Sequence, residues 1–133
     1  MPVLEPVRDP AHHPELLTLM AGAGVRPTDT FVAKAYCVST TWGRRARAAG
    51  YQTWGYYYGR EVDAGATPLA ATQAAWTLLG LDLAASAEAW RAVRSFGKPV
   101  VGHVADDAEQ AHRLISDGAD GVMLADVRSV LTH

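Results

Sequence analysis

Short apolar runs of strand length alternate along the whole chain with longer amphipathic stretches. Runs rich in β-branched and aromatic residues predict strands at residues 2–7, 31–37, 51–58, 76–83, 98–104 and 120–124. Apolar residues at helical spacing predict helices at residues 13–22, 41–49, 68–75, 86–96, 107–117 and 127–131. Between residues 58 and 68, glycine and charged residues predict a loop. This alternation is typical of α/β proteins with parallel strands.

Local signals support several of the predicted helices. Leu16, Leu17 and Met20 lie at helical spacing, so we expect them to form the buried face of the first helix. Ser86 precedes an amphipathic stretch and is expected to cap it. Gly118 follows the 107–117 stretch and is expected to end that helix, because glycine readily adopts left-handed backbone angles.

The pattern amounts to six β/α units of about 20–30 residues each. Right-handed crossovers of this kind give either an open doubly wound sheet or part of a (β/α)8 barrel. In both architectures, ligands bind at the carboxyl ends of the strands. The polar residues predicted in the strands or near these ends are Glu5, Lys34, Tyr36, Tyr56, Tyr58, Asp82, His103 and Asp126.

Three of these residues are candidates for binding chemistry. Glu5 in an apolar strand is costly to bury without a metal or another cation, and otherwise it is an exposed residue on an edge strand. Lys34 interrupts an apolar run, so it is either a phosphate or carboxylate partner or a lysine that reaches to solvent. His103 is a ligand, an acid/base group or a hydrogen-bonded core histidine, and no second histidine lies at the spacing of a metal site. Asp82 is either a functional group at a strand end or a cap for the helix that follows it, and we expect the cap.

Composition narrows the functional classes. The 133 residues, 49% of them hydrophobic, are enough for one globular domain spanning 1–133. A net charge of -2 disfavours nucleic-acid binding, and the single cysteine excludes an internal disulfide framework. Neither a membrane span nor a signal peptide is recognisable. We therefore expect a cytoplasmic protein or a component of a particle.

The order of the elements resembles the glycerophosphodiester phosphodiesterase family. The most specific part is GKPVVGHVADDAEQAHRLISDGADGVMLADVRSVL (97–131), which is similar to that family's penultimate strand, its helix and its closing strand. Upstream, VLEPV (3–7) resembles the family's apolar-Glu-x-Lys strand, and residues 31–58 resemble the strand, helix and strand that follow. The resemblance covers nearly the whole chain and corresponds to the family's third to eighth strands. It implies an α/β fold, an incomplete TIM-type (β/α) barrel with about six parallel strands that lacks the first two β/α units.

The resemblance also implies roles for individual residues. Glu5 matches a glutamate that binds a divalent cation, calcium or magnesium. The family's phosphate-contacting lysine, two residues further on, is replaced by Val7, so Lys34 on the neighbouring strand is a substitute candidate. His103 opens the segment that corresponds to the family's Trp-Thr-Val-Asn sequence and is a second candidate for phosphate contact.

The family's His-Arg-Gly motif, Glu-x-Asp metal pair and second catalytic histidine have no counterpart in the sequence. We therefore expect a phosphodiesterase-like chain that is catalytically incomplete on its own and serves as a structural or binding component of an assembly, for example a phage particle. One alternative is a metal-dependent hydrolase of glycerophosphodiesters that another chain or a further N-terminal segment completes. Another is an unrelated phosphate-binding α/β protein with its anion site near the turn at 118–121 and Ser129. Exposed sheet edges predict a homo-oligomer or a partner chain that completes the barrel.

Overall fold

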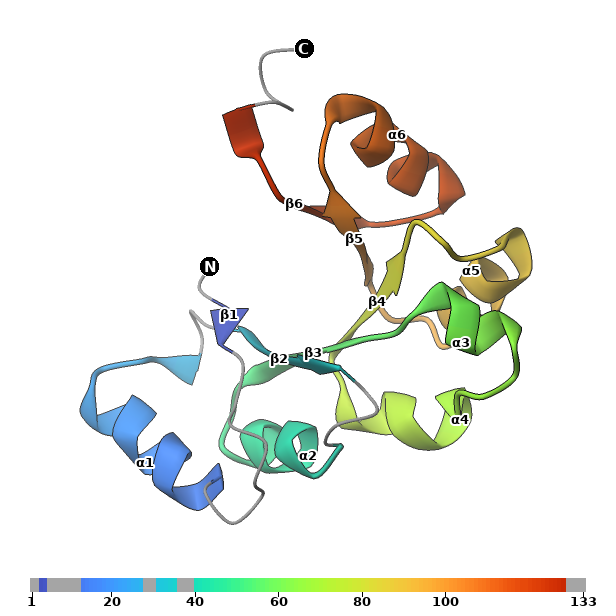
Figure 1. Ribbon diagram of the computed structural model, residues 1–133. Helices are drawn as coiled ribbons and strands as arrows, with labels where there is room; N and C mark the ends of the chain where they lie inside the picture. The colour runs from blue at the N-terminus through green and yellow to red at the C-terminus, as the bar shows by residue number, and fades with distance from the viewer. Residues whose placement is uncertain (1–2, 5–12, 28–30, 36–39, 129–133) are drawn as a thin grey trace. The chain divides into compact units, whose positions relative to one another are not determined.

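The computed structural model describes residues 3–4, 13–27, 31–35 and 40–128, with 3–4, 13 and 31–35 described by their backbone. The strands in this part of the chain are β1 Val3–Leu4, β2 Phe31–Ala35, β3 Gln52–Tyr56, β4 Leu78–Asp82, β5 Val100–Ala105 and β6 Gly121–Leu124 (Figure 1). The helices are α1 His13–Gly22, α2 Thr40–Ala48, α3 Gly59–Asp63, α4 Leu69–Thr72, α5 Ala87–Arg94 and α6 Ala108–Asp117, with a short 3-10 helix at Gln73–Ala75.

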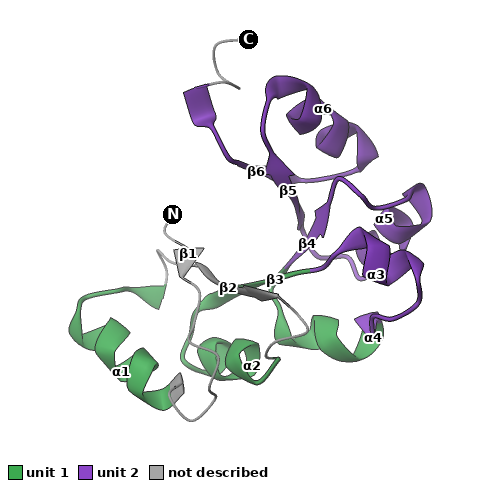
Figure 2. Cartoon of the chain, viewed as in Figure 1, with its two compact units in different colours: residues 1–56, 70–78 green, residues 57–69, 79–133 purple. Residues whose placement is uncertain are grey.

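The chain divides into two compact units (Figure 2). Unit 1 comprises residues 1–56 and 70–78, and unit 2 comprises residues 57–69 and 79–133. In unit 1, β1 pairs with β2 and β2 pairs with β3, both in parallel. In unit 2, β5 pairs in parallel with both β4 and β6. Parallel strands that neighbour one another in sequence and in the sheet confirm the predicted α/β class. The single domain spanning 1–133 stays a prediction.

The core of unit 1 forms between α1 and α2. Met20, Trp42, Ala46 and Tyr51 are buried together, and the partly buried Leu16, Leu17 and Val25 pack against them. The hydroxyl group of Tyr51 donates a hydrogen bond to the carbonyl oxygen of Val25 at 3.1 Å. The predicted buried face of the first helix, and its bounds at residues 13–22, are therefore confirmed.

Trp76 fills a second part of unit 1, and two glycines make room for its indole ring. A Cβ atom added to Gly55 would lie 2.2 Å from Cδ1 of Trp76, and one added to Gly43 would lie 2.7 Å from its Cζ3. Both distances are far below van der Waals contact, so β3 and α2 can approach Trp76 only where they carry no side chain.

In unit 2, the helices α5 and α6 begin close to the residues that the sequence predicts, and α6 also ends there. The hydroxyl group of Ser86 accepts a hydrogen bond from the backbone N–H of Ala89 and caps α5. Asp107 caps α6 in the same way, and Gly118 ends it with a left-handed φ of 119°. Leu114 of α6 is fully buried against β5, where Gly102 leaves room for it.

The structure corrects one element. Residues 59–63 form the short helix α3, although the sequence predicts a loop there, and β3 ends at Tyr56 rather than at residue 58. The strands at 76–83 and 98–104 are confirmed with shorter or shifted bounds. The predicted strands at 2–7 and 31–37 and the predicted helix at 127–131 lie partly outside the described residues. No helix in the described part of the chain is long and apolar enough to cross a membrane.

Candidate functional site

The candidate site lies in unit 2, at the carboxyl ends of β4 and β5. Asp82 is the last residue of β4, and it stands directly opposite His103 of β5 in the parallel register. The segment that follows β3 brings Tyr57, Tyr58 and Gly59 to the same two side chains. Because ligands bind at the carboxyl ends of parallel strands in folds of this class, this cluster is the candidate site of unit 2.

Asp82 holds the start of α3. Its Oδ1 atom accepts a hydrogen bond from the backbone N–H of Gly59 at 2.9 Å, and its side chain is half-buried. Gly59 itself is packed so closely that an added Cβ would lie 2.3 Å from the Cα atom of Ala85. The prediction that Asp82 caps the following helix is wrong, because Ser86 caps α5. The aspartate instead binds the first residue of a helix that precedes it by 23 positions in the sequence.

His103 is almost completely buried, with 7% of its surface exposed. Its Nε2 atom lies 3.2 Å from the carbonyl oxygen of Tyr57, which can only accept, so Nε2 carries the proton in this contact. The ring of Tyr58 lies edge-on to the imidazole, with 6.3 Å between centroids. Burial lowers the pKa of His103, and the Asp82 carboxylate and the Tyr57 carbonyl oppose that shift only in part. The imidazole is therefore neutral near pH 7.

A second carboxylate ties α3 to α5. The two oxygens of Asp63 accept hydrogen bonds from the hydroxyl group and from the backbone N–H of Ser86. Sequence reasoning missed this contact and the Asp82–Gly59 contact, since each joins residues 23 positions apart. No local pattern signals either one.

The three predicted site residues are described to different extents. Lys34 lies in β2 of unit 1, where its backbone is paired with Gly55, and its side chain lies outside the described part of the structure. Glu5 lies outside the described residues altogether. His103 belongs to unit 2 and is joined there with Asp82, so its interpretation as a hydrogen-bonded core histidine agrees with the geometry.

No group of three His, Cys, Asp or Glu side chains within the described ranges could hold a metal ion. Glu5, the predicted ligand of calcium or magnesium, lies outside those ranges. The metal site stays a prediction.

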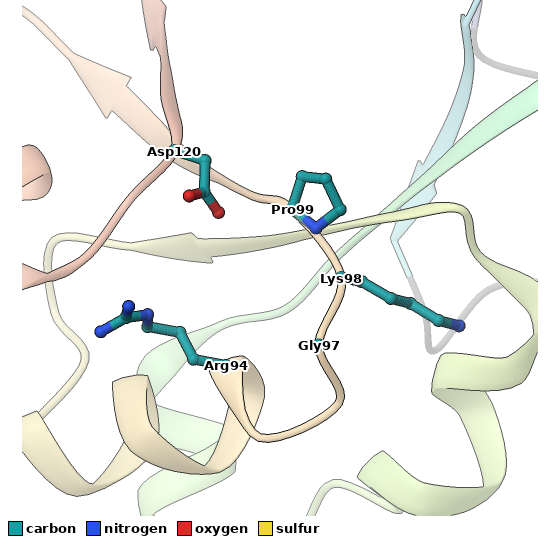
Figure 3. A pocket seen from close by; sticks show the side chains of 5 residues that line it. All are labelled: Arg94, Gly97, Lys98, Pro99 and Asp120. Atoms are coloured by element: carbon teal, nitrogen blue, oxygen red, sulfur yellow. The ribbon is translucent and has the colours of Figure 1, made fainter.

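An open hollow of about 400 Å³ lies at the other end of the strands of unit 2 (Figure 3). It is lined by Arg94, Gly97, Lys98, Pro99 and Asp120, beside the starts of β5 and β6. Asp120 accepts a hydrogen bond from the backbone N–H of Val100 at 2.8 Å, and Lys98 extends away from Arg94 and Asp120 (Figure 3). In barrels, this amino-terminal end serves stability rather than ligand binding.

Comparison with known proteins places this fold. No protein-family model matches the sequence, and no curated protein matches it either. A solved structure from Silicibacter pomeroyi DSS-3, described as a glycerophosphoryl diester phosphodiesterase, matches with a TM-score of 0.66 and 19% sequence identity. The match covers 92% of this chain and 45% of that protein. The chain has part of a glycerophosphoryl diester phosphodiesterase fold.

The resemblance to a phosphodiesterase and the incomplete TIM-type barrel are thereby confirmed. The chain spans less than half the length of that phosphodiesterase. The assignment to the third to eighth strands stays a prediction. So do the residue roles that the resemblance implies for Glu5, Lys34 and His103.

Proposed function

We propose that this chain is a phosphodiesterase-like protein that is catalytically incomplete on its own and serves as a structural or binding component of an assembly, for example a phage particle. The main support for the proposal is the burial of His103 and the hydrogen bond of its imidazole ring. A general acid or base must reach the proton that it transfers. His103 is 7% exposed and its Nε2 atom contacts a backbone carbonyl oxygen, so we assign the ring a structural role rather than proton transfer to a substrate.

Asp82 supports the same conclusion. Its Oδ1 atom is bound to the backbone N–H of Gly59, and its charge faces the His103 imidazole. The two strand-end groups therefore join three chain segments of unit 2, those that contain Gly59, Asp82 and His103. Both side chains therefore have a structural role, in which buried polar groups fix the ends of strands by satisfying backbone donors and acceptors.

The alternative is a metal-dependent hydrolase of glycerophosphodiesters that becomes active when another chain or a further N-terminal segment completes it. The partial structural match supports this alternative, because it covers 45% of the Silicibacter pomeroyi protein and another chain or segment would have to supply the remainder of that fold. In this alternative Glu5 binds calcium or magnesium and Lys34 contacts phosphate. The third possibility, an unrelated phosphate-binding α/β protein, has its anion site near the turn at 118–121 and Ser129, and Ser129 lies outside the described residues.

A phosphodiesterase assay separates these functions. The chain is incubated with a glycerophosphodiester and with calcium or magnesium, and the released alcohol is measured beside a Glu5→Gln variant. We expect the same background rate from both proteins. Metal-dependent turnover that Glu5→Gln abolishes would refute the proposal and establish the hydrolase. Loss of the same turnover in Lys34→Met would then identify the phosphate contact.

A further inference from the structure

Charge is unevenly distributed along the chain. Residues 30–60 contain Lys34, Arg44, Arg45, Arg47 and Arg60 and no aspartate or glutamate. This segment therefore carries +5, and the remainder carries −7, within a total of −2. Such segregation favours contacts between surfaces of opposite sign.

The positive charge gathers on α2 of unit 1. Trp42, Gly43 and Ala46 form the buried face of this helix, whereas Arg44 and Arg45 are exposed. Arg47 is exposed too, and its Nη1 atom donates a hydrogen bond to the carbonyl oxygen of Ala74 at 2.6 Å. A guanidinium group has five N–H donors, so this bond leaves Arg47 able to bind a carboxylate as well. We call Arg44, Arg45 and Arg47 the basic face.

The negative charge gathers around α6 of unit 2. Residues 106–120 contain five acidic residues and one arginine, a net charge of −4. Asp106, Asp107 and Glu109 are exposed at the start of the helix, and we call them the acidic face. A hollow of about 470 Å³ lined by Asp107, Ala108, Glu109 and His112 indents this face. An arginine side chain that entered the hollow would meet two carboxylate-bearing residues.

We infer that the basic face of one copy of this chain binds the acidic face of a second copy. This inference rests on the proposed role in an assembly and names the surfaces that would build it. Charge complementarity identifies the partner, because exposed arginines on one unit match an indented carboxylate surface on the other. A nucleic acid is a poorer partner, since the negative charge outside residues 30–60 repels phosphates. The contact uses two different surfaces, so every copy can bind one copy at each face, and the chains assemble head to tail.

Sedimentation velocity tests the inference on the full chain. We expect oligomers at about 0.1 M NaCl that dissociate at about 1 M, because the screening length falls from about 10 Å to about 3 Å. The variant R44E/R45E should raise the dissociation constant at least about tenfold, and D106K/E109K should do the same. The control R60E/R91E changes the net charge as much as R44E/R45E does, and it alters exposed residues outside both faces. It should associate like the wild type.

Mixing the two variants gives the decisive result. R44E/R45E keeps its acidic face and D106K/E109K keeps its basic face, and the two reversed faces are again opposite in charge, so the mixture can restore the contact that each variant alone has lost. We expect two proteins that are each monomeric to associate when they are mixed. A monomeric mixture beside an associating wild type would overturn the inference, and so would a wild type that is monomeric at 0.1 M salt. Circular dichroism of each variant checks that it is folded.

The experiment is independent of catalysis. Hydrolysis of a glycerophosphodiester by the chain would refute the proposed function and leave the association data unchanged. Failure of the two variants to associate when mixed would refute the head-to-tail contact and leave the proposed inactive protein unaffected. Association that resists both charge variants would show that the copies meet through another surface, which also overturns the inference.

Discussion

Replacing Asp82 by alanine should lower the stability of unit 2, because it removes a hydrogen bond to a charged group. The carboxylate accepts a hydrogen bond from the Gly59 N–H at 2.9 Å in a half-buried position. A hydrogen bond to a charged group contributes about 1.5–3 kcal/mol, and its removal leaves the N–H without an acceptor. We therefore expect Asp82→Ala to lower the free energy of unfolding by about 2 kcal/mol, or the melting temperature by about 8 °C.

The same variant should change the titration of His103. The Asp82 charge raises the pKa of the imidazole against the larger effect of burial, so removing that charge should lower the pKa of His103 further. Asp82→Asn provides the matched comparison. Asparagine keeps an oxygen that accepts from Gly59, so the stability loss should be about 1 kcal/mol, whereas the pKa should fall as it does in Asp82→Ala.

Urea unfolding followed by tryptophan fluorescence gives the free energies, and NMR titration of the imidazole proton gives the pKa. Asp126→Ala serves as a control, because Asp126 also accepts a backbone N–H, at 3.0 Å from Arg128, but on the exposed surface. Its effect should stay below about 0.5 kcal/mol. Equal losses in the free energy of unfolding for Asp82→Ala and Asp126→Ala would refute this reasoning. A His103 pKa that is the same in Asp82→Ala as in the wild type would also refute it.

Three further predictions concern stability. Burial lowers the pKa of His103 in the folded protein, so below the usual value of 6.5 the unfolded chain binds the proton more readily. The free energy of unfolding should therefore be highest above pH 6.5 and decline as the pH falls below it. Urea titrations at pH 7.5 and pH 5 measure this difference, and His103→Gln should remove it. Gly55→Ala should cost about 3 kcal/mol in thermal unfolding, because the new Cβ would lie 2.2 Å from Trp76, whereas Gly22→Ala, with open space around it, should change little. Ser86→Ala should cost about 1 kcal/mol through loss of the α5 cap, and helix protection in hydrogen exchange would report it.

The sequence predicted those features that depend on neighbouring residues. The face formed by Leu16, Leu17 and Met20, the Ser86 cap and the Gly118 helix end are all encoded within one or two helical turns. The helix α3 was not predictable in this way. Its first N–H is satisfied by Asp82, and that pairing depends on β4 lying beside the segment that follows β3.

The candidate site shows the same division. The sequence placed Asp82 and His103 at strand ends, and the register of β4 and β5 confirms it. The partners of these side chains were beyond sequence reasoning, because the Tyr57 carbonyl and the Gly59 N–H are backbone groups that no residue type signals. Whether His103 is exposed or buried likewise depends on tertiary packing.

The division of the chain into units also affects the order in which it can fold during synthesis. Unit 1 takes residues 1–56 and 70–78, and unit 2 takes residues 57–69 and 79–133, so the chain passes between them three times. All of unit 1 has left the ribosome once Leu78 has emerged. The segment 57–69 is made earlier than β4, but the hydrogen bonds of Gly59 and Asp63 to later residues can form only after Asp82 and Ser86 have emerged. At about 5–20 residues per second this delay lasts about a second or more. Vectorial synthesis thus favours completing unit 1 while α3 still lacks its partners.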